Sequence, residues 1–313
     1  MAGLIKKYFP KSKIIFLGRT YTKDVIALSE HVDEFLNYDE LEKLDKKNQK
    51  LLLREVHADV IIHVFPKKRI AFLARSVVPL RVGTTNRLYH WLTCNKLIRL
   101  SRKNSYLHES QLNLKLLDFL KINTEVPLKE IYNYYGFNKV PALDPVYTSL
   151  IDKNKFNVIL HPKSKGSAKE WGLENFSKLI DLLNVQKYQV FISGTAEDGK
   201  LMQDFLHAFP RVINLTGKLS LQQFIAFIAE CDSLVAASTG PLHIAAALNK
   251  KAIGLFSTKR PIHPGRWMPL GKDAHYVVFD ENCERCFNNE DCDCIRKINP
   301  QQVVDLIEQH GEF

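Results

Sequence analysis

Short apolar runs alternate with amphipathic segments along most of the chain. The runs of strand length lie at residues 14–17, 60–65, 158–161, 189–194, 212–215, 234–237, 252–256 and 276–279. Between them, apolar residues recur every three or four positions, as in helices, over 22–31, 41–56, 108–120, 173–185, 202–209, 221–229 and 300–309. Strands that alternate with helices are typical of a parallel sheet with helices on both faces. We therefore predict an α/β protein.

An irregular segment separates two such halves. Residues 122–156 contain Pro127, Gly136, Pro141 and Pro145, and the regular periodicity is lost there. The length of 313 residues suits two domains. We expect an N-terminal domain with its linker over 1–150 and a C-terminal domain over 151–313. In parallel sheets, ligands bind outside the carboxyl ends of the strands, and we expect the site in the cleft between the halves.

One strand-to-helix turn stands out in the second half. The apolar run 234–237 stops at Ser238, Thr239, Gly240 and Pro241, and a helical Ala/Leu pattern begins at once. Ser and Thr are good N-caps, Gly allows close backbone approach, and Pro suits the first helical turn. The unpaired amides and partial positive charge of such a helix end suit a phosphate. Turns of this kind also occur in many α/β proteins without any ligand.

Three more polar loops follow predicted strands of the second half. They lie at residues 161–171, 193–198 and 215–220, and the first is rich in lysine. Taken alone, each loop is also explained as solvated surface. Because the carboxyl ends of parallel strands meet at one edge of a sheet, the four loops together predict a polar pocket for an anion.

The net charge and the hydropathy of the chain limit the classes of binding partner that the sequence suits. The chain has 44 Lys and Arg against 34 Asp and Glu, a net charge of +10 that favours anionic partners. The basic residues are spread out and no nucleic-acid-binding motif accompanies them, so we expect anionic lipid or phosphorylated glycolipid rather than nucleic acid. No run approaches the roughly 18 apolar residues of a membrane-spanning helix, and no signal-peptide pattern is present. We predict a cytoplasmic protein.

Four of the six cysteines lie in one short segment, residues 283–294. Four thiolates can hold a structural zinc ion, and the candidate ligands are Cys283, Cys286, Cys292 and Cys294. Their spacing differs from the usual pair of Cys-x-x-Cys motifs. Reduced thiols and two disulfides are the alternatives.

These motifs together resemble glycosyltransferase family 9, the ADP-heptose:lipopolysaccharide heptosyltransferases. The resemblance rests on residues 161–171, 193–197, 215–221 and 238–248, with further matches at 81–83 and 254–267. It implies a GT-B architecture of two Rossmann-like domains, in which the C-terminal domain binds the nucleotide-sugar donor and the N-terminal domain binds the acceptor. It also implies an inverting transfer of heptose from ADP-heptose to a lipopolysaccharide core or lipid-linked acceptor, at the cytoplasmic face of the inner membrane and with no cofactor for catalysis.

The resemblance also implies roles for individual residues. Lys169 matches the lysine that contacts the donor diphosphate. The full set of implied donor-binding residues is Ser164, Lys169, Glu197, Ser238, Thr239, Gly240, Pro241, Leu242 and His243. Many family members carry an aspartate where this chain has Ser238, and a neutral hydroxyl cannot make the same charged hydrogen bond to a sugar. A transferase that uses another nucleotide-sugar is therefore an alternative.

The family's catalytic base is an aspartate in a loop after the first strand, and that loop is absent from this sequence. We therefore assign no catalytic residue. We expect that the N-terminal domain lacks its first strand and that Met1 is an internal methionine, with roughly twenty native residues before it. A donor-binding but inactive family member is the alternative. On the acceptor side, Lys67, Lys68 and Arg69 follow the strand at 60–65 and are the candidates for binding acceptor phosphates.

Overall fold

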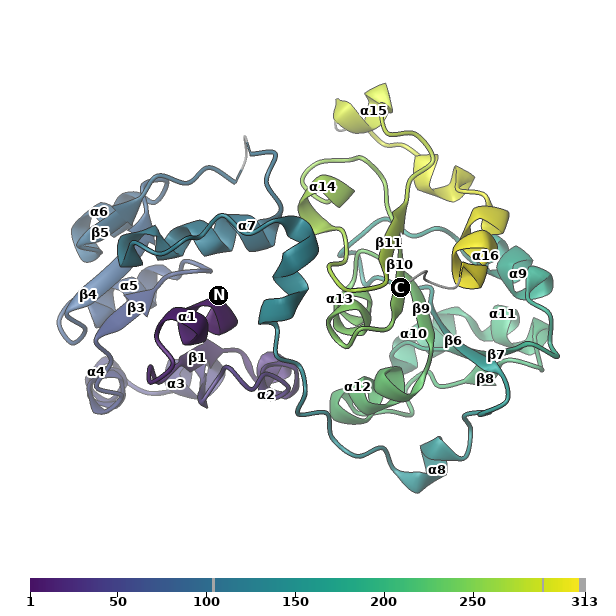
Figure 1. Ribbon diagram of the computed structural model, residues 1–313, viewed down its shortest axis with the longest axis horizontal. Helices are drawn as coiled ribbons and strands as arrows, with labels where there is room; N and C mark the ends of the chain where they lie inside the picture. The colour runs from purple at the N-terminus through teal and green to yellow at the C-terminus, as the bar shows by residue number, and fades with distance from the viewer. Residues whose placement is uncertain (103–104, 289, 310–313) are drawn as a thin grey trace. The chain divides into compact units, whose positions relative to one another are not determined.

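The computed structural model describes residues 1–102, 105–288 and 290–309. They form two compact units, Met1–Gly136 and Phe137–Phe313 (Figure 1). We expected the division at residue 150, and the structure places it earlier. The reason is that the second half of the linker packs on unit 2: the Asp144 amide donates to Gln223 Oε1 at 2.8 Å, and the Tyr147 hydroxyl donates to the Lys218 carbonyl at 2.7 Å.

Unit 2 contains a six-stranded parallel sheet in the order β11-β10-β9-β6-β7-β8. Its strands are β6 (Phe156–His161), β7 (Tyr188–Ile192), β8 (Ile213–Asn214), β9 (Ser233–Ala237), β10 (Lys251–Leu255) and β11 (Ala274–Val277). The chain runs outward from β6 through β7 to β8 and then returns to the other side of β6 at β9. The strand order therefore reverses between β6 and β9, and such a reversal opens a crevice at the carboxyl ends of the two strands.

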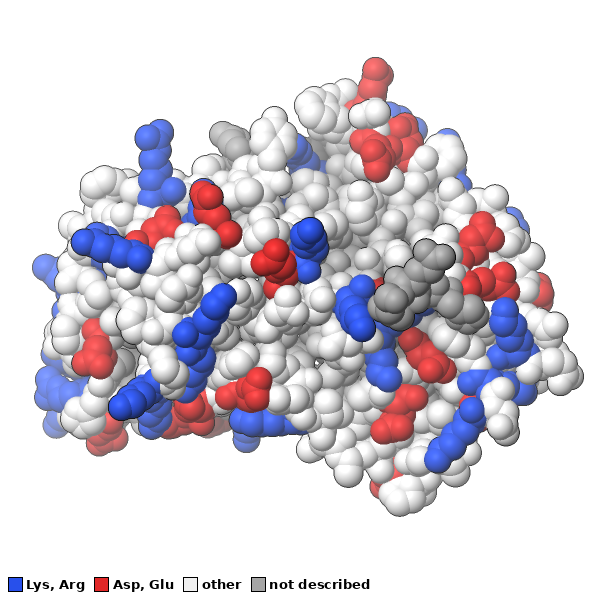
Figure 2. Space-filling model, in the orientation of Figure 1, with Lys and Arg blue, Asp and Glu red and all other residues white. Residues whose placement is uncertain are grey.

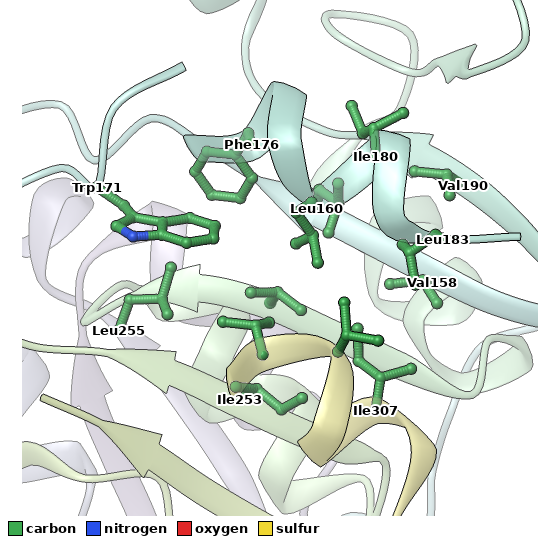
Figure 3. Packing of buried hydrophobic residues seen from close by; sticks show 14 of the residues in the cluster. Val158, Leu160, Trp171, Phe176, Ile180, Leu183, Val190, Ile253, Leu255 and Ile307 are labelled. Atoms are coloured by element: carbon green, nitrogen blue, oxygen red, sulfur yellow. The ribbon is translucent and has the colours of Figure 1, made fainter. Parts of the chain in front are cut away.

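Helices cover both faces of this sheet. They are α8 (Pro145–Thr148), α9 (Leu173–Leu182), α10 (Ala196–Leu201), α11 (Gln203–Ala208), α12 (Leu221–Glu230), α13 (Gly240–Ala247), α14 (Pro264–Trp267), α15 (Glu284–Phe287) and α16 (Pro300–Glu308), with the 3-10 helix η4 (Cys294–Lys297). Figure 3 shows Phe176 of α9 and Ile307 of α16 in the same cluster as Leu160. On the opposite face, Phe227 of α12 meets Phe191 of β7 with ring centroids 4.9 Å apart.

Unit 1 holds two separate parallel sheets, β1-β2 and β3-β4-β5. The strands are β1 (Ile15–Gly18), β2 (Glu34–Asn37), β3 (Val60–Ile62), β4 (Leu80–Thr84) and β5 (Lys96–Ile98). The helices are α1 (Ala2–Tyr8), η1 (Thr20–Thr22), α2 (Lys23–Ala27), α3 (Tyr38–Lys43), α4 (Lys46–Glu55), α5 (Lys68–Ala74), α6 (Leu88–Thr93), α7 (Glu109–Leu114), η2 (Lys115–Leu120) and η3 (Leu128–Tyr134). Leu17 of β1 and Ile61 of β3 pack against one buried cluster, so a shared core joins the two sheets.

All eight predicted strands are present, and the structure adds β2, β4 and β5. The helical pattern over 41–56 is divided into α3 and α4, because the Asp45 side chain caps α4 by accepting from the Asn48 amide at 2.9 Å. The pattern over 108–120 continues from α7 into the 3-10 helix η2. Among the described residues, no helix is both long and apolar enough to cross a membrane.

Gly254 of β10 supports the first turn of α13. A Cβ at this position would lie 2.5 Å from Phe256 Cε2 and 2.9 Å from Leu242 Cδ2, and both side chains are fully buried. We expect Gly254→Ala to lower the free energy of unfolding by about 1–3 kcal/mol, because a packed core cannot yield without strain. Urea denaturation measures the change. Gly240→Ala is the control: its Cβ would meet no described atom within 4 Å, and its effect should stay within about 0.5 kcal/mol. Equal losses in the two variants would contradict this account.

Candidate functional site

A cavity of about 150 Å³ lies at the carboxyl edge of the unit 2 sheet. Loops that follow three adjacent strands form its walls: Lys169 comes after β6, Ser238 after β9, and Lys259 and Arg260 after β10. The remaining wall is mainly apolar and includes Phe256, Ile262 and Ile295. The cavity thus combines three cationic side chains with apolar surface, a composition suited to an anion that carries an apolar or aromatic group.

The amino-terminal end of α13 directly follows Ser238 in the cavity wall. Its N-cap residue is Thr239, whose side chain makes no capping hydrogen bond and whose buried Oγ1 finds no partner among the described residues. Gly240 is exposed, and a Cβ there would meet no described atom within 4 Å. The first amides of the helix therefore lack a side-chain cap, and the Cβ position of Gly240 faces open space. Such an end of a helix binds anions through its amides and its dipole.

Glu170 organises the loop after β6. Its Oε1 accepts from the Ser164 amide at 2.9 Å, and its Oε2 pairs with Lys163 Nζ at 3.0 Å. Ser164 is buried, and its hydroxyl donates to the Ala168 carbonyl at 2.7 Å. The Ser164 side chain is thus engaged inside the loop, and its contribution is to shape the segment that carries Lys169.

Lys169 extends from the cavity wall to the Cys-rich segment. Its Nζ donates to the Cys292 carbonyl at 2.9 Å and to Asp291 Oδ1 at 2.5 Å. The hydrogen bond from Lys169 holds the pKa of the Asp291 carboxyl below its usual range. The Asp291 side chain is 94 % exposed, so the ion pair is weakly stabilising. An incoming phosphate can therefore replace Asp291 at little cost, while the carbonyl keeps Lys169 in place.

The other predicted donor residues lie in different settings. Leu242 is fully buried, so only its amide can meet a ligand. Pro241 lies in the first turn of α13, and the ring of His243 approaches Trp267 of α14 at 6.4 Å between centroids. Glu197 is exposed in the first turn of α10, where hydrogen bonds from its own backbone amide and from Thr195 lower its pKa, and it is not among the residues that line the cavity.

The three predicted acceptor cations, Lys67, Lys68 and Arg69, have different surroundings in unit 1. Arg69 Nε donates to Oε1 of Gln49 at 3.0 Å, and Gln49 is 1 % exposed, so Arg69 ties α5 to α4. Lys67 is the N-cap residue of α5, and its Nζ lies 5.1 Å from the ring centroid of Phe65. Lys68 begins the helix. Of the three, Arg69 has a clear structural role within unit 1.

The four cysteines of the Cys-rich segment lie together. Their Sγ atoms are all within 4.8 Å of one another, and Cys286, Cys292 and Cys294 are buried while Cys283 is half-buried. The pairs Cys283–Cys292 and Cys286–Cys294 have Sγ–Sγ distances of 3.5 and 3.2 Å. These distances exceed the S–S bond of about 2.05 Å. All four are free thiols in this structure, so it does not contain the two disulfides considered as an alternative.

The sequence matches the model of "Glycosyltransferase family 9 (heptosyltransferase)" over residues 49–294. The chain belongs to glycosyltransferase family 9. Family membership identifies it as a heptosyltransferase-type glycosyltransferase, which confirms the family predicted from the motifs.

Two proteins of Haemophilus influenzae are similar in sequence to part or most of this chain. Lipooligosaccharide heptosyltransferase 2 of Haemophilus influenzae is 34% identical over 121 residues, which are 37% of this chain and 34% of that protein. The chain thus spans about a third of that relative. A second protein of the same organism, assigned only as a glycosyltransferase without a named substrate, is 25% identical over 294 residues, 88% of this chain and 83% of its own.

Two solved structures share the fold over almost the whole chain. Escherichia coli ADP-heptose lipopolysaccharide heptosyltransferase II has a TM-score of 0.74 at 17% identity, with 98% of this chain and 91% of that chain covered. The family 9 glycosyltransferase of Veillonella parvula has a TM-score of 0.77 at 16% identity, with 99% and 92% covered. The predicted GT-B fold class is confirmed.

The sequence motifs did not point to two cationic residues that line the cavity, Lys259 and Arg260. The signal that could have found them is the one used for the other loops: a polar, basic run at 257–260 directly after the apolar strand β10. Because β10 neighbours β9 in the sheet, its loop opens at the same edge as the turn before α13.

His161, the last residue of β6, makes the stability of unit 2 depend on pH. Its Nδ1 lies 2.9 Å from Ser193 Oγ, and burial lowers its pKa to about 4. The unfolded chain, with a histidine pKa of about 6.5, binds more protons between these values, so stability falls as the pH drops from about 6.5 to 4. We expect this residue to account for about 2–3 kcal/mol of that loss.

Urea denaturation at pH 7 and pH 4.5 measures this effect in the wild type and in His161→Gln. The variant should lose less free energy of unfolding between the two pH values. His207→Gln changes an exposed histidine of the same unit and should follow the wild type. If His161→Gln kept the full wild-type dependence, the burial of His161 would not be its source.

Proposed function

We propose that this family 9 protein binds ADP-heptose in unit 2 and transfers the heptose, with inversion, to a lipopolysaccharide core acceptor. The observation that carries the proposal is that Lys169 and Ser238 line one cavity, and Ser238 leads directly into the uncapped end of α13. A nucleoside diphosphate supplies the two groups that this cavity suits, namely an anion for the cations and amides and a flat ring for the apolar wall. The names of the heptosyltransferases among its relatives support the same donor and acceptor.

The chemistry of the proposed step is a displacement at the anomeric carbon. An acceptor hydroxyl forms the new glycosidic bond as the bond from the anomeric carbon to the diphosphate breaks, and a general base takes the hydroxyl proton. Negative charge grows on the departing diphosphate. Lys169 and the amides of α13 are oriented before the reaction, so they stabilise this charge with little reorganisation. Lys259 and Arg260 add positive charge to the same wall.

Ser238 is the residue that supports an alternative within the same reaction class, a transferase with another nucleotide-sugar as its donor. It lines the cavity where many family members have an acidic residue. A serine hydroxyl can accept or donate one neutral hydrogen bond and recognises a sugar hydroxyl less strongly than a carboxylate does. A donor with another sugar is therefore the second candidate, and a protein that binds the nucleotide without transfer is the third.

Acceptor binding is assigned to unit 1 as part of the same proposal. Lys67 and Lys68 are the candidates for acceptor phosphates, whereas Arg69 is engaged with Gln49. Figure 2 shows Lys and Arg side chains distributed over the visible face and interspersed with Asp and Glu. A net charge of +10 still favours approach to an anionic membrane surface, and we propose that the reaction takes place at the cytoplasmic face of the inner membrane.

Lys169→Met tests the diphosphate site. The change removes a charged hydrogen-bond donor and keeps an unbranched side chain, so we expect ADP to bind about 10- to 100-fold more weakly. Isothermal titration calorimetry with ADP gives the affinity. Lys165→Met is the matched control, because Lys165 is exposed in the same loop and does not line the cavity.

Gly240→Ala provides a second test of the same site. Its Cβ would occupy open space at the first residue of α13. If the diphosphate binds against this turn, as proposed, ADP affinity should fall by about tenfold or more while the midpoint of unfolding stays unchanged. Wild-type ADP affinity in both Lys169→Met and Gly240→Ala would overturn the assignment of this cavity to the diphosphate.

A panel of nucleotide-sugars identifies the donor. We expect the full chain to transfer sugar from ADP-heptose to a heptose-deficient lipopolysaccharide acceptor, followed by mass spectrometry of the product. Transfer from a different nucleotide-sugar alone would favour the second candidate. Tight ADP binding without transfer from any member of the panel, also after the segment expected before Met1 is restored, would establish the inactive form.

A further inference from the structure

The four cysteine Sγ atoms of the Cys-rich segment, residues 283–294, lie close together in space. A metal ion with four thiolate ligands at about 2.3 Å in a tetrahedron holds neighbouring sulfurs about 3.8 Å apart. Here the Sγ atoms of Cys283 and Cys292 are 3.5 Å apart, those of Cys286 and Cys294 are 3.2 Å apart, and all four atoms lie within 4.8 Å of one another. The sulfurs are therefore already near the positions that a tetrahedral ion requires, and small rotations of the side chains bring them to its bond lengths.

The surroundings of these sulfurs are those of thiolate ligands. Backbone amides aim at two of them: the amide of Cys286 donates to the sulfur of Cys283, and the amide of Cys294 donates to the sulfur of Cys292. Second-shell hydrogen bonds of this kind orient the ligands of metal sites. The buried cluster in this segment consists of the cysteines themselves.

The described part of the segment has little regular structure. It holds the four residues of α15, and the 3-10 helix η4 begins at its last cysteine. Elements this short depend on contacts with their surroundings for stability. The two Sγ–Sγ distances are longer than a disulfide bond, and coordination of one ion by all four sulfurs fits them.

We propose that Cys283, Cys286, Cys292 and Cys294 bind one tetrahedral, thiolate-preferring transition-metal ion, Zn²⁺ or Fe²⁺. On binding, each of the four thiols releases one proton to solvent, so that four thiolates and one divalent ion leave a net charge of −2. Within the segment, Arg285 donates to the Asp291 carbonyl, and its Nε lies 3.7 Å from Glu290 Oε2.

The ion has a consequence for the donor cavity, and this part rests on the proposed function. Lys169 Nζ is held by the Cys292 carbonyl at 2.9 Å, and Lys259 Nζ is held by the Glu290 carbonyl at 3.1 Å. Both carbonyls belong to the stretch between Cys286 and Cys294, and Ile295 just beyond it lines the cavity. An ion that fixes this stretch therefore fixes two of the cations in the cavity wall.

Metal content is the direct test of the site. We expect purified, reduced full-length protein to contain about one Zn or Fe per chain by plasma mass spectrometry. The two ions are distinguished by the element found and by the visible thiolate-to-iron absorption that Zn²⁺ lacks. Cys286→Ser and Cys294→Ser should lose the ion, whereas Cys94→Ser, which changes an isolated cysteine of unit 1, should retain it.

Titration of the metal-depleted wild type with Co²⁺ provides a measurement that does not depend on how the variants fold. A tetrahedral thiolate site gives intense d–d and charge-transfer bands that saturate at about one equivalent. The proposal is overturned if reduced protein contains neither metal and gives no such bands with Co²⁺.

ADP affinity tests the link to the cavity separately. Removal of the ion with a chelator should weaken ADP binding about fivefold or more, and re-addition of Zn²⁺ should restore it. In Lys169→Met the chelator should have a smaller effect, because one of the two affected cations is already gone. A protein that holds the ion but binds no ADP overturns the proposed function and leaves the metal site standing; ADP affinity that is unchanged by the chelator overturns the link alone.

Discussion

The reversal of strand order between β6 and β9 is the constraint on which the rest of unit 2 depends. All strands of the sheet run parallel, so every strand ends at the same edge. The chain leaves β6 toward β7 and leaves β9 toward β10, which separates the two loops and opens the space between them. Lys169 and Ser238 meet the same cavity for this reason, although they are far apart in the sequence.

The loop after β6 and the amino-terminal end of α13 supply the chemistry of the site, and the sheet sets where these two elements lie. Glu170 binds the Ser164 amide and the Lys163 ammonium within the loop after β6, and these contacts hold the part of the loop that carries Lys169 in a fixed conformation. Two strands away in the sheet, the close contact of Gly254 with Leu242 and Phe256 seats α13 directly on β10. The cation and the helix amides are therefore both set before any ligand arrives, and this preorganisation is what electrostatic stabilisation of a leaving group requires.

Strands β9 and β10 of unit 2 were predictable because all their residues are buried and the strands read as nearly continuous apolar runs. The missed strands β2, β4 and β5 contain Glu34, Arg81 and Lys96, which interrupt that pattern. In the site, Lys169 and Ser238 could be found from loop chemistry. The bond from Lys169 to Cys292 could not, because it joins residues 123 positions apart and depends on how η4 packs against the loop after β6.

The long sequence separation between Lys169 and Cys292 affects the order in which the chain folds. Further contacts join the loop after β6 and the first turn of α9 to residues 296–298: Trp171 Nε1 donates to the Ile298 carbonyl at 3.0 Å, and Asn175 Nδ2 donates to the Arg296 carbonyl at 2.7 Å. Closing loops of more than a hundred residues is slow compared with forming local helices. During synthesis, β6 and α9 leave the ribosome long before their partners exist. The cavity is therefore completed late in folding, only after residues 291–298 have docked on the loop after β6.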